Sequence, residues 1–81
     1  MPLKNYDPYE IDVNEIRKIM IDENIETISS LAKKSHINRG TLSSVLKKER
    51  YPTAPVMYGL VSALNIPPEK AGKIFFTRKL T

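Results

Sequence analysis

The chain has 81 residues, 41% of them hydrophobic, with a formal net charge of +4 and no cysteine or tryptophan. This length favours one small domain, and the lack of cysteine excludes a disulfide scaffold and a thiolate zinc site. The longest apolar run, Ile19–Ile21, is far shorter than the roughly 20 residues that span a bilayer. We therefore expect a soluble, cytoplasmic protein with no cofactor, metal, membrane or small-molecule substrate.

The charge is distributed unevenly. Residues 1–26 carry three basic and seven acidic groups, a net charge of −4, whereas residues 27–81 carry ten basic and two acidic groups, a net charge of +8. A segment this positive attracts polyanions. Charge alone does not distinguish a nucleic acid from an anionic membrane, an acidic protein or a solvated lysine-rich surface.

The first helix is expected to begin after an N-terminal arm. Residues 1–11 contain Pro2 and Pro8 and lack helical periodicity, so they predict this arm. Asp12 and Glu15 have the spacing of a capping box, in which each side chain caps the other's backbone amide. The following helix is predicted to end near Asn24. Its apolar positions are Val13, Ile16, Ile19 and Met20.

Two short helices with an interruption between them are predicted next. Thr27 is a suitable N-cap for the first of the pair, whose inward residues are Ile28, Leu31 and Ala32. Residues 35–38 break the pattern, and Asn38 is a suitable cap for a helix from about Arg39 to Glu49. The apolar stripe of that helix is Leu42, Val45 and Leu46.

Two further helices complete the chain. Tyr51 precedes a proline and so ends the preceding helix, and Thr53 caps a fourth helix with Pro55 in its first turn. The apolar positions of the fourth helix are Met57, Leu60, Val61 and Leu64, and Asn65 ends it. Pro67 and Pro68 open a fifth helix that reaches Phe76. No segment alternates with period two, so we predict an all-α domain of five helices over residues 12–77, with a tail at 78–81.

The second and third predicted helices have the pattern of a helix-turn-helix pair. The second helix of such a pair enters the DNA major groove, which is about 12 Å wide. It therefore needs polar side chains outside and apolar anchors inside, and residues 39–47 provide both. Ala32 suits the pair as well, because a small side chain allows the two helices to cross closely.

The stretch from Leu31 to Thr53 resembles the XRE family of helix-turn-helix regulators, which includes phage Cro and repressor N-terminal domains. The motifs that carry the resemblance are Leu31-Ala32, Ile37-Asn38-Arg39, Thr41-Leu42-Ser43, Pro52-Thr53 and Ala63-Leu64-Asn65-Ile66. The resemblance covers about residues 13–76 and implies a lambda-repressor-like fold. Two positions depart from the family's usual pattern: His36 replaces a glycine with positive φ, and Ser35 replaces an apolar residue.

Candidate DNA contacts follow from this arrangement. Arg39 can pair bidentately with a guanine, although contact with a phosphate or with solvent is the alternative. Asn38 also serves as a cap, and Gly40 permits either close DNA approach or close packing. The candidate base contacts are Asn38, Arg39, Gly40, Thr41, Ser43 and Ser44. The candidate phosphate contacts are Thr27, Ser29, Ser30, Lys47, Lys48, Arg50 and Thr53.

Phe75 and Phe76 are assigned to a candidate dimer interface. Because they lie about 100° apart around a helix, one is expected to face the core and the other a second copy of the chain. Tyr6 and Tyr9 belong to an arm that wraps DNA, that packs a tyrosine on the first helix or that is disordered. Because phosphate would repel Asp7 and Glu10, the last two interpretations are favoured. His36 is the single histidine, so a metal site is not expected.

The sequence predicts a non-enzymatic protein, because no nucleophile has a plausible paired base and no glycine-rich phosphate loop is present. We interpret it as a sequence-specific transcriptional regulator of double-stranded DNA, acting as a homodimer on a palindromic operator. The resemblance favours a Cro-type phage repressor. An antitoxin, a restriction–modification controller or a protein-binding adaptor remains an alternative.

Overall fold

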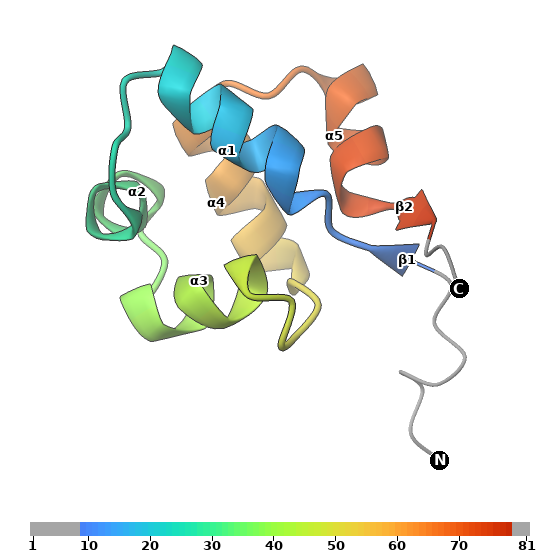
Figure 1. Ribbon diagram of the computed structural model, residues 1–81, viewed down its shortest axis with the longest axis horizontal. Helices are drawn as coiled ribbons and strands as arrows, with labels where there is room; N and C mark the ends of the chain where they lie inside the picture. Colours follow the sequence, from blue (N-terminus) through green and yellow to red (C-terminus); the bar gives the residue numbers. More distant parts are fainter. Residues whose placement is uncertain (1–8, 79–81) are drawn as a thin grey trace.

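The computed structural model describes residues 9–78, which form five helices and one short two-stranded ribbon (Figure 1). The elements are β1 (Tyr9–Glu10), α1 (Val13–Asp22), α2 (Ile28–Ser35), α3 (Arg39–Leu46), α4 (Ala54–Leu64), α5 (Pro68–Phe75) and β2 (Thr77–Arg78). In Figure 1, α1 lies in front of α4, with α2 at one end, α3 below, and α5 and the ribbon at the other end. None of these five helices is long and apolar enough to cross a membrane. The prediction of a five-helix, all-α domain is confirmed.

Each helix contributes at least one fully buried side chain to a shared apolar core. These residues are Ile16, Leu31, Leu42, Leu60 and Ile74, from α1 to α5 in order. Complete burial of a leucine or isoleucine side chain contributes about 1.5–3 kcal/mol. The core therefore fixes all five helices relative to one another, including the two that form the helix-turn-helix pair.

Three of the four predicted N-caps make the expected hydrogen bond. The side chains of Asp12, Thr27 and Asn38 accept from backbone amides at the starts of α1, α2 and α3. Thr53 lies at the N-cap position of α4, but its side chain makes no capping hydrogen bond. The capping box of α1 is only half formed, because the Asp12 amide donates to Ile74 O at 2.7 Å, and the carboxylate of Glu15 pairs with Lys70 at 3.6 Å.

Four of the helices are followed by a residue with left-handed backbone conformation, and none of these residues is glycine. Asn24, His36, Lys48 and Asn65 have φ between 53° and 63°. Lys48 ends α3 earlier than the predicted Glu49: the amide of Lys48 donates to Val45 O at 3.0 Å and that of Glu49 to Ser44 O at 2.9 Å. This pair of bonds is the Schellman motif.

The ribbon was not predicted from the sequence. β1 and β2 are antiparallel, with Tyr9 opposite Arg78 and Glu10 opposite Thr77. Ile11 is only 2% exposed, and the amide of Asp12 donates to Ile74 O at 2.7 Å. Residues 9–11 thus belong to the folded domain rather than to an arm. Strands of two residues are too short for a period-two pattern to appear.

The buried face of α4 differs from the predicted one. Val56 and Ala63 are buried together with Leu60 and Leu64, whereas Met57 and Val61 are only partly buried. Apolar residues occupy most positions of α4, so the periodicity could not single out the face that packs. Met57 and Val61 pack against the edge of the core, and the prediction missed the fully packed positions Val56 and Ala63.

Candidate nucleic-acid interface

The turn between α2 and α3 is compact. His36 adopts φ 60°, and the Ile37 amide donates to Ala32 O at 3.2 Å. Histidine is one of the better-tolerated residues in the left-handed region. Ala32 is buried between the helices, as expected for a close crossing. The left-handed turn that the sequence predicts at His36 is confirmed.

Ser35 is buried, at 7% exposure, where the family tends to place an apolar residue. Its hydroxyl donates to Leu31 O at 2.6 Å, so its burial leaves no unsatisfied donor. A buried hydroxyl without a partner would cost about 1–3 kcal/mol. The local bond therefore lets a polar side chain occupy the end of α2 without disturbing the turn.

Helix α4 supports the turn through Gly59. A Cβ atom at this position would lie 2.9 Å from Ser35 O and 3.1 Å from Ile37 Cδ1. The backbones of α4 and the turn thus approach too closely for any other residue without movement. Sequence reasoning missed this role; the signal was a glycine inside a helical pattern, which usually has a packing reason.

Helix α3 presents two distinct faces. Leu42, Val45 and Leu46 are buried, which confirms the predicted apolar stripe. On the other side Arg39, Gly40 and Lys47 are exposed, and Thr41, Ser43 and Ser44 are half-buried. The exposed positions therefore carry either cations or no side chain at all, and short hydroxyl side chains lie beside them.

Asn38 organises the first turn of α3. Its Oδ1 accepts from the Gly40 amide at 2.8 Å and from the Thr41 amide at 3.2 Å. A Cβ atom on Gly40 would lie 3.1 Å from the same oxygen. Asn38 is thus an N-cap, and Gly40 leaves room for it.

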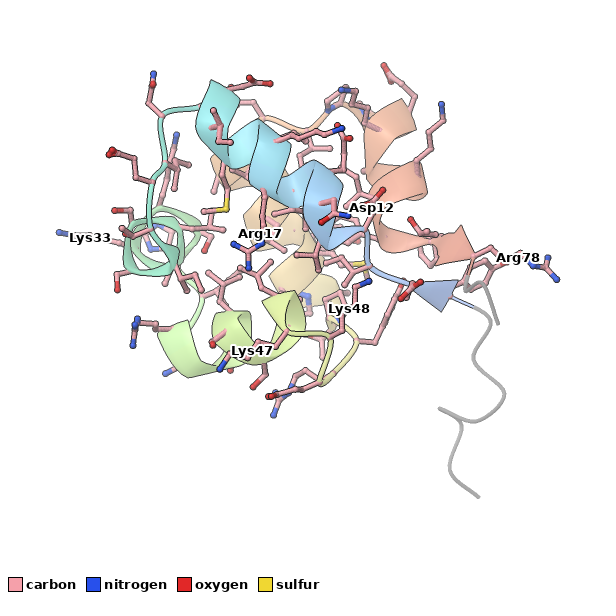
Figure 2. All side chains as sticks on the ribbon, in the orientation of Figure 1. Asp12, Arg17, Lys33, Lys47, Lys48 and Arg78 are labelled. Atoms are coloured by element: carbon pink, nitrogen blue, oxygen red, sulfur yellow. The ribbon has the colours of Figure 1, made fainter. Side chains whose placement is uncertain are left out.

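The predicted phosphate-contacting residues fall into two groups. Thr27, Ser29 and Ser30 are exposed at the start of α2, where the Thr27 hydroxyl accepts from the Ser30 amide at 3.0 Å. Four more lie at or after the end of α3, and all are exposed: Lys47, Lys48, Arg50 and Thr53. Figure 2 shows Lys33 on α2, and Lys47 and Lys48 on the α3 side of the molecule. Of these, Lys48 has an acidic partner, because its Nζ lies 3.3 Å from Glu10 Oε1.

A family model for the Cro/C1-type HTH DNA-binding domain matches residues 15–70, which is more than half of the 81-residue chain. The chain belongs to this family. The match includes all of α2, α3 and α4, and it confirms the resemblance to Cro-like helix-turn-helix proteins. No curated protein and no solved structure matches the chain.

In this Cro/C1-type domain the two candidate dimer residues differ sharply. Phe75 is 2% exposed and lies in the core of its own chain, so it is the one of the pair that faces the core and it is not available to a dimer interface. Phe76 is 52% exposed, and its ring meets Tyr9 edge to face with centroids 5.7 Å apart. The ring of Phe76 also contacts the ring of Tyr51. The Tyr51 hydroxyl donates to Phe75 O. We call Tyr9, Tyr51 and Phe76 the aromatic cluster.

The two tyrosines of the predicted arm have different outcomes. Tyr9 packs on Phe76, which directly follows α5. Tyr6 lies outside the described residues. The aromatic cluster therefore joins the ribbon to the segment between α3 and α4.

Proposed function

We propose that this chain is a sequence-specific transcriptional regulator that reads the major groove of double-stranded DNA with α3. The observation that carries the proposal is the two-faced character of α3, with buried leucines and valine inside and Arg39 and Lys47 exposed. Membership of the Cro/C1-type family supports DNA binding of this kind. The major groove admits an α-helix and presents hydrogen-bonding base edges, so short and polar side chains on the outer face of α3 suit it.

Each candidate base contact has a role that its chemistry supports. Arg39 begins α3 and reaches a guanine through two hydrogen bonds, which discriminates that base by about 1–3 kcal/mol. Ser43, Ser44 and Thr41 approach base edges with short hydroxyl side chains. Asn38 uses its Oδ1 for the cap and retains its amide NH₂ for a base or a phosphate. Gly40 keeps the α3 backbone close to the groove.

In this proposal, two groups of residues bind DNA phosphates on either side of the groove: those at the start of α2 and those that follow α3. The start of α2 offers backbone amides and a positive dipole end. The DNA backbone beyond the C-terminal end of α3 is bound by the second group: Lys47, Lys48, Arg50 and Thr53. Contacts of this kind position the protein and carry no sequence information.

The protein acts as a homodimer on a palindromic operator in this proposal. A two-fold dimer places two copies of α3 about one helical turn of DNA apart. Phe76 and Tyr9 supply exposed aromatic surface next to the ribbon, which a second copy would cover. Repression of the Cro type by a phage protein is the role we propose on the strength of the Cro/C1-type domain, and an antitoxin or a restriction–modification controller that uses the same domain is the alternative.

A protein-binding adaptor is the alternative of a different class. An adaptor that used α3 would present large apolar side chains there, whereas the exposed residues of α3 are Arg39 and Gly40, followed by the exposed C-cap residue Lys47. This composition favours DNA.

Selection of bound duplexes from a random pool tests the proposal. We expect one enriched motif arranged as a palindrome with fixed spacing. Arg39→Ala should then relax the preference at one position in each half-site and cost about 1–3 kcal/mol there. Recovery of no enriched motif would contradict sequence-specific binding and favour the adaptor.

A further inference from the structure

We propose that Arg17 of α1 binds a DNA backbone phosphate beside the groove that α3 enters. The inference rests on the proposed function and extends it to a helix outside the helix-turn-helix pair. Sequence reasoning gave Arg17 no role, because it lies in the acidic first third of the chain.

The two flanks of α1 face different parts of the domain. Glu15 lies on one flank and pairs with Lys70 of α5 at 3.6 Å. Arg17 follows two residues later, and at about 100° per residue it lies on nearly the opposite side of the helix. The buried residues Ile16 and Met20 point into the core between these flanks. Arg17 is thus directed away from α5.

Figure 2 shows where this flank leads: the guanidinium of Arg17 extends from α1 toward α3. Arg17 is exposed. An exposed cation directed toward α3 lies where a duplex bound to that helix would bring its backbone.

Arg17 has no acidic partner among residues 9–78. The ion pairs in this part of the chain join Lys48 to Glu10 and Lys70 to Glu15. A guanidinium offers five donors in a planar fork that matches two phosphate oxygens. No carboxylate among residues 9–78 pairs with the guanidinium of Arg17. The guanidinium is therefore available to an anion from outside the domain.

Lys18 provides a matched control on the same helix. It is exposed and carries the same charge, but it lies about 100° further round, on the side of α1 that faces away from the core. If the charge of α1 acts only through general electrostatics, removing either cation should weaken DNA binding equally. If Arg17 contacts a phosphate, removing Arg17 should weaken binding more.

The test measures duplex affinity against salt concentration for native protein, Arg17→Ala, Arg17→Lys and Lys18→Ala, on the selected operator and on a scrambled duplex. Loss of one phosphate contact reduces the slope of log K against log salt by about 0.9. We expect this loss for Arg17→Ala on both duplexes, with about three- to ten-fold weaker binding near 0.1 M salt. Arg17→Lys should keep the native slope, and Lys18→Ala should change neither slope nor affinity appreciably. Thermal unfolding by circular dichroism checks that each variant folds.

Equal slopes for Arg17→Ala and Lys18→Ala would overturn the assignment of Arg17 while leaving the proposed function intact. Failure of the native protein to bind any duplex would overturn the proposed function itself, and the phosphate contact with it.

Discussion

Glu10 and Lys48 join the first strand to the end of α3, with 3.3 Å between Oε1 and Nζ. Lys48 is also the left-handed residue of the Schellman motif that ends α3. A carboxylate therefore neutralises one of the cations proposed to bind phosphate. The ion pair and the DNA backbone compete for the same ammonium group.

This competition predicts the effect of Glu10→Gln. Removal of the carboxylate should raise affinity for every duplex by about two- to five-fold and steepen the salt slope by up to about 0.9, as Lys48 gains a phosphate contact. The pair is exposed, so stability should change by less than about 1 kcal/mol. Glu69→Gln, which removes an exposed charge from α5, is the control. Equal affinities for the two variants would show that Glu10 does not restrain Lys48.

Gly59→Ala should destabilise the domain. The added Cβ would lie 2.9 Å from Ser35 O, and a backbone oxygen cannot move away as the end of a flexible side chain can. Forcing extra atoms into a packed site costs about 1–3 kcal/mol, which exceeds the gain in helix propensity. Urea unfolding measures the difference, and a variant more stable than the native protein would contradict the close approach of α4 to the turn.

Gly72→Ala should have the opposite sign. Apart from the adjacent residues and the backbone of α5 itself, no atom lies within 4 Å of a Cβ built at Gly72, and the residue is exposed inside α5. Alanine is favoured over glycine by about 0.8–1 kcal/mol in a helix interior. We expect a gain in unfolding free energy of up to that amount, by the same urea measurement. A loss of stability would indicate an unrecognised constraint on the α5 backbone.

Two substitutions of Asn38 separate its cap from its DNA contact. Asn38→Ala removes the acceptor for two amides of α3 and should cost about 0.5–2 kcal/mol in stability. Asn38→Asp keeps an acceptor at the cap and should retain stability. Its negative charge should nevertheless weaken binding to all duplexes, as measured by titration. Native affinity in Asn38→Asp would place this end of α3 away from DNA.

Phe76→Glu should abolish the proposed dimer, because it places a charge in the exposed part of the aromatic cluster. Sedimentation should report the mass of one chain, and affinity for a palindromic duplex should fall more than affinity for a half-site. Tyr58→Glu is a matched control, since Tyr58 is 74% exposed on α4 and lies outside the cluster. An unchanged mass for Phe76→Glu would remove this surface from the assembly.

The sequence was most informative where structure is local. The helices and the caps at Asp12, Thr27 and Asn38 depend on residues within one or two turns, and the apolar stripe of α3 appears directly as a spacing. The relationships that escaped prediction join distant segments. Ribbon pairing, the burial of Ile11 and the contact of Gly59 with the turn depend on tertiary packing.

The candidate site divides in the same way. The exposed residues of α3 could be predicted because only one helix face is apolar. The ion pair of Lys48 with Glu10 and the direction of Arg17 could not, because each depends on where another element lies. Which of Phe75 and Phe76 faces the core could not be predicted either, because two adjacent aromatic residues do not reveal which of them the core will accept.

The pairing of β1 with β2 has a consequence for the order of folding. The ribbon joins the first and last described elements of the chain. Its formation therefore closes the longest loop among these elements, and the entropic cost of closing a loop rises with its length. The α2–α3 pair, by contrast, needs contacts only between neighbouring segments. We expect the ribbon to assemble last and to fray first, so that its amides exchange with solvent deuterium while those of α2 and α3 remain protected.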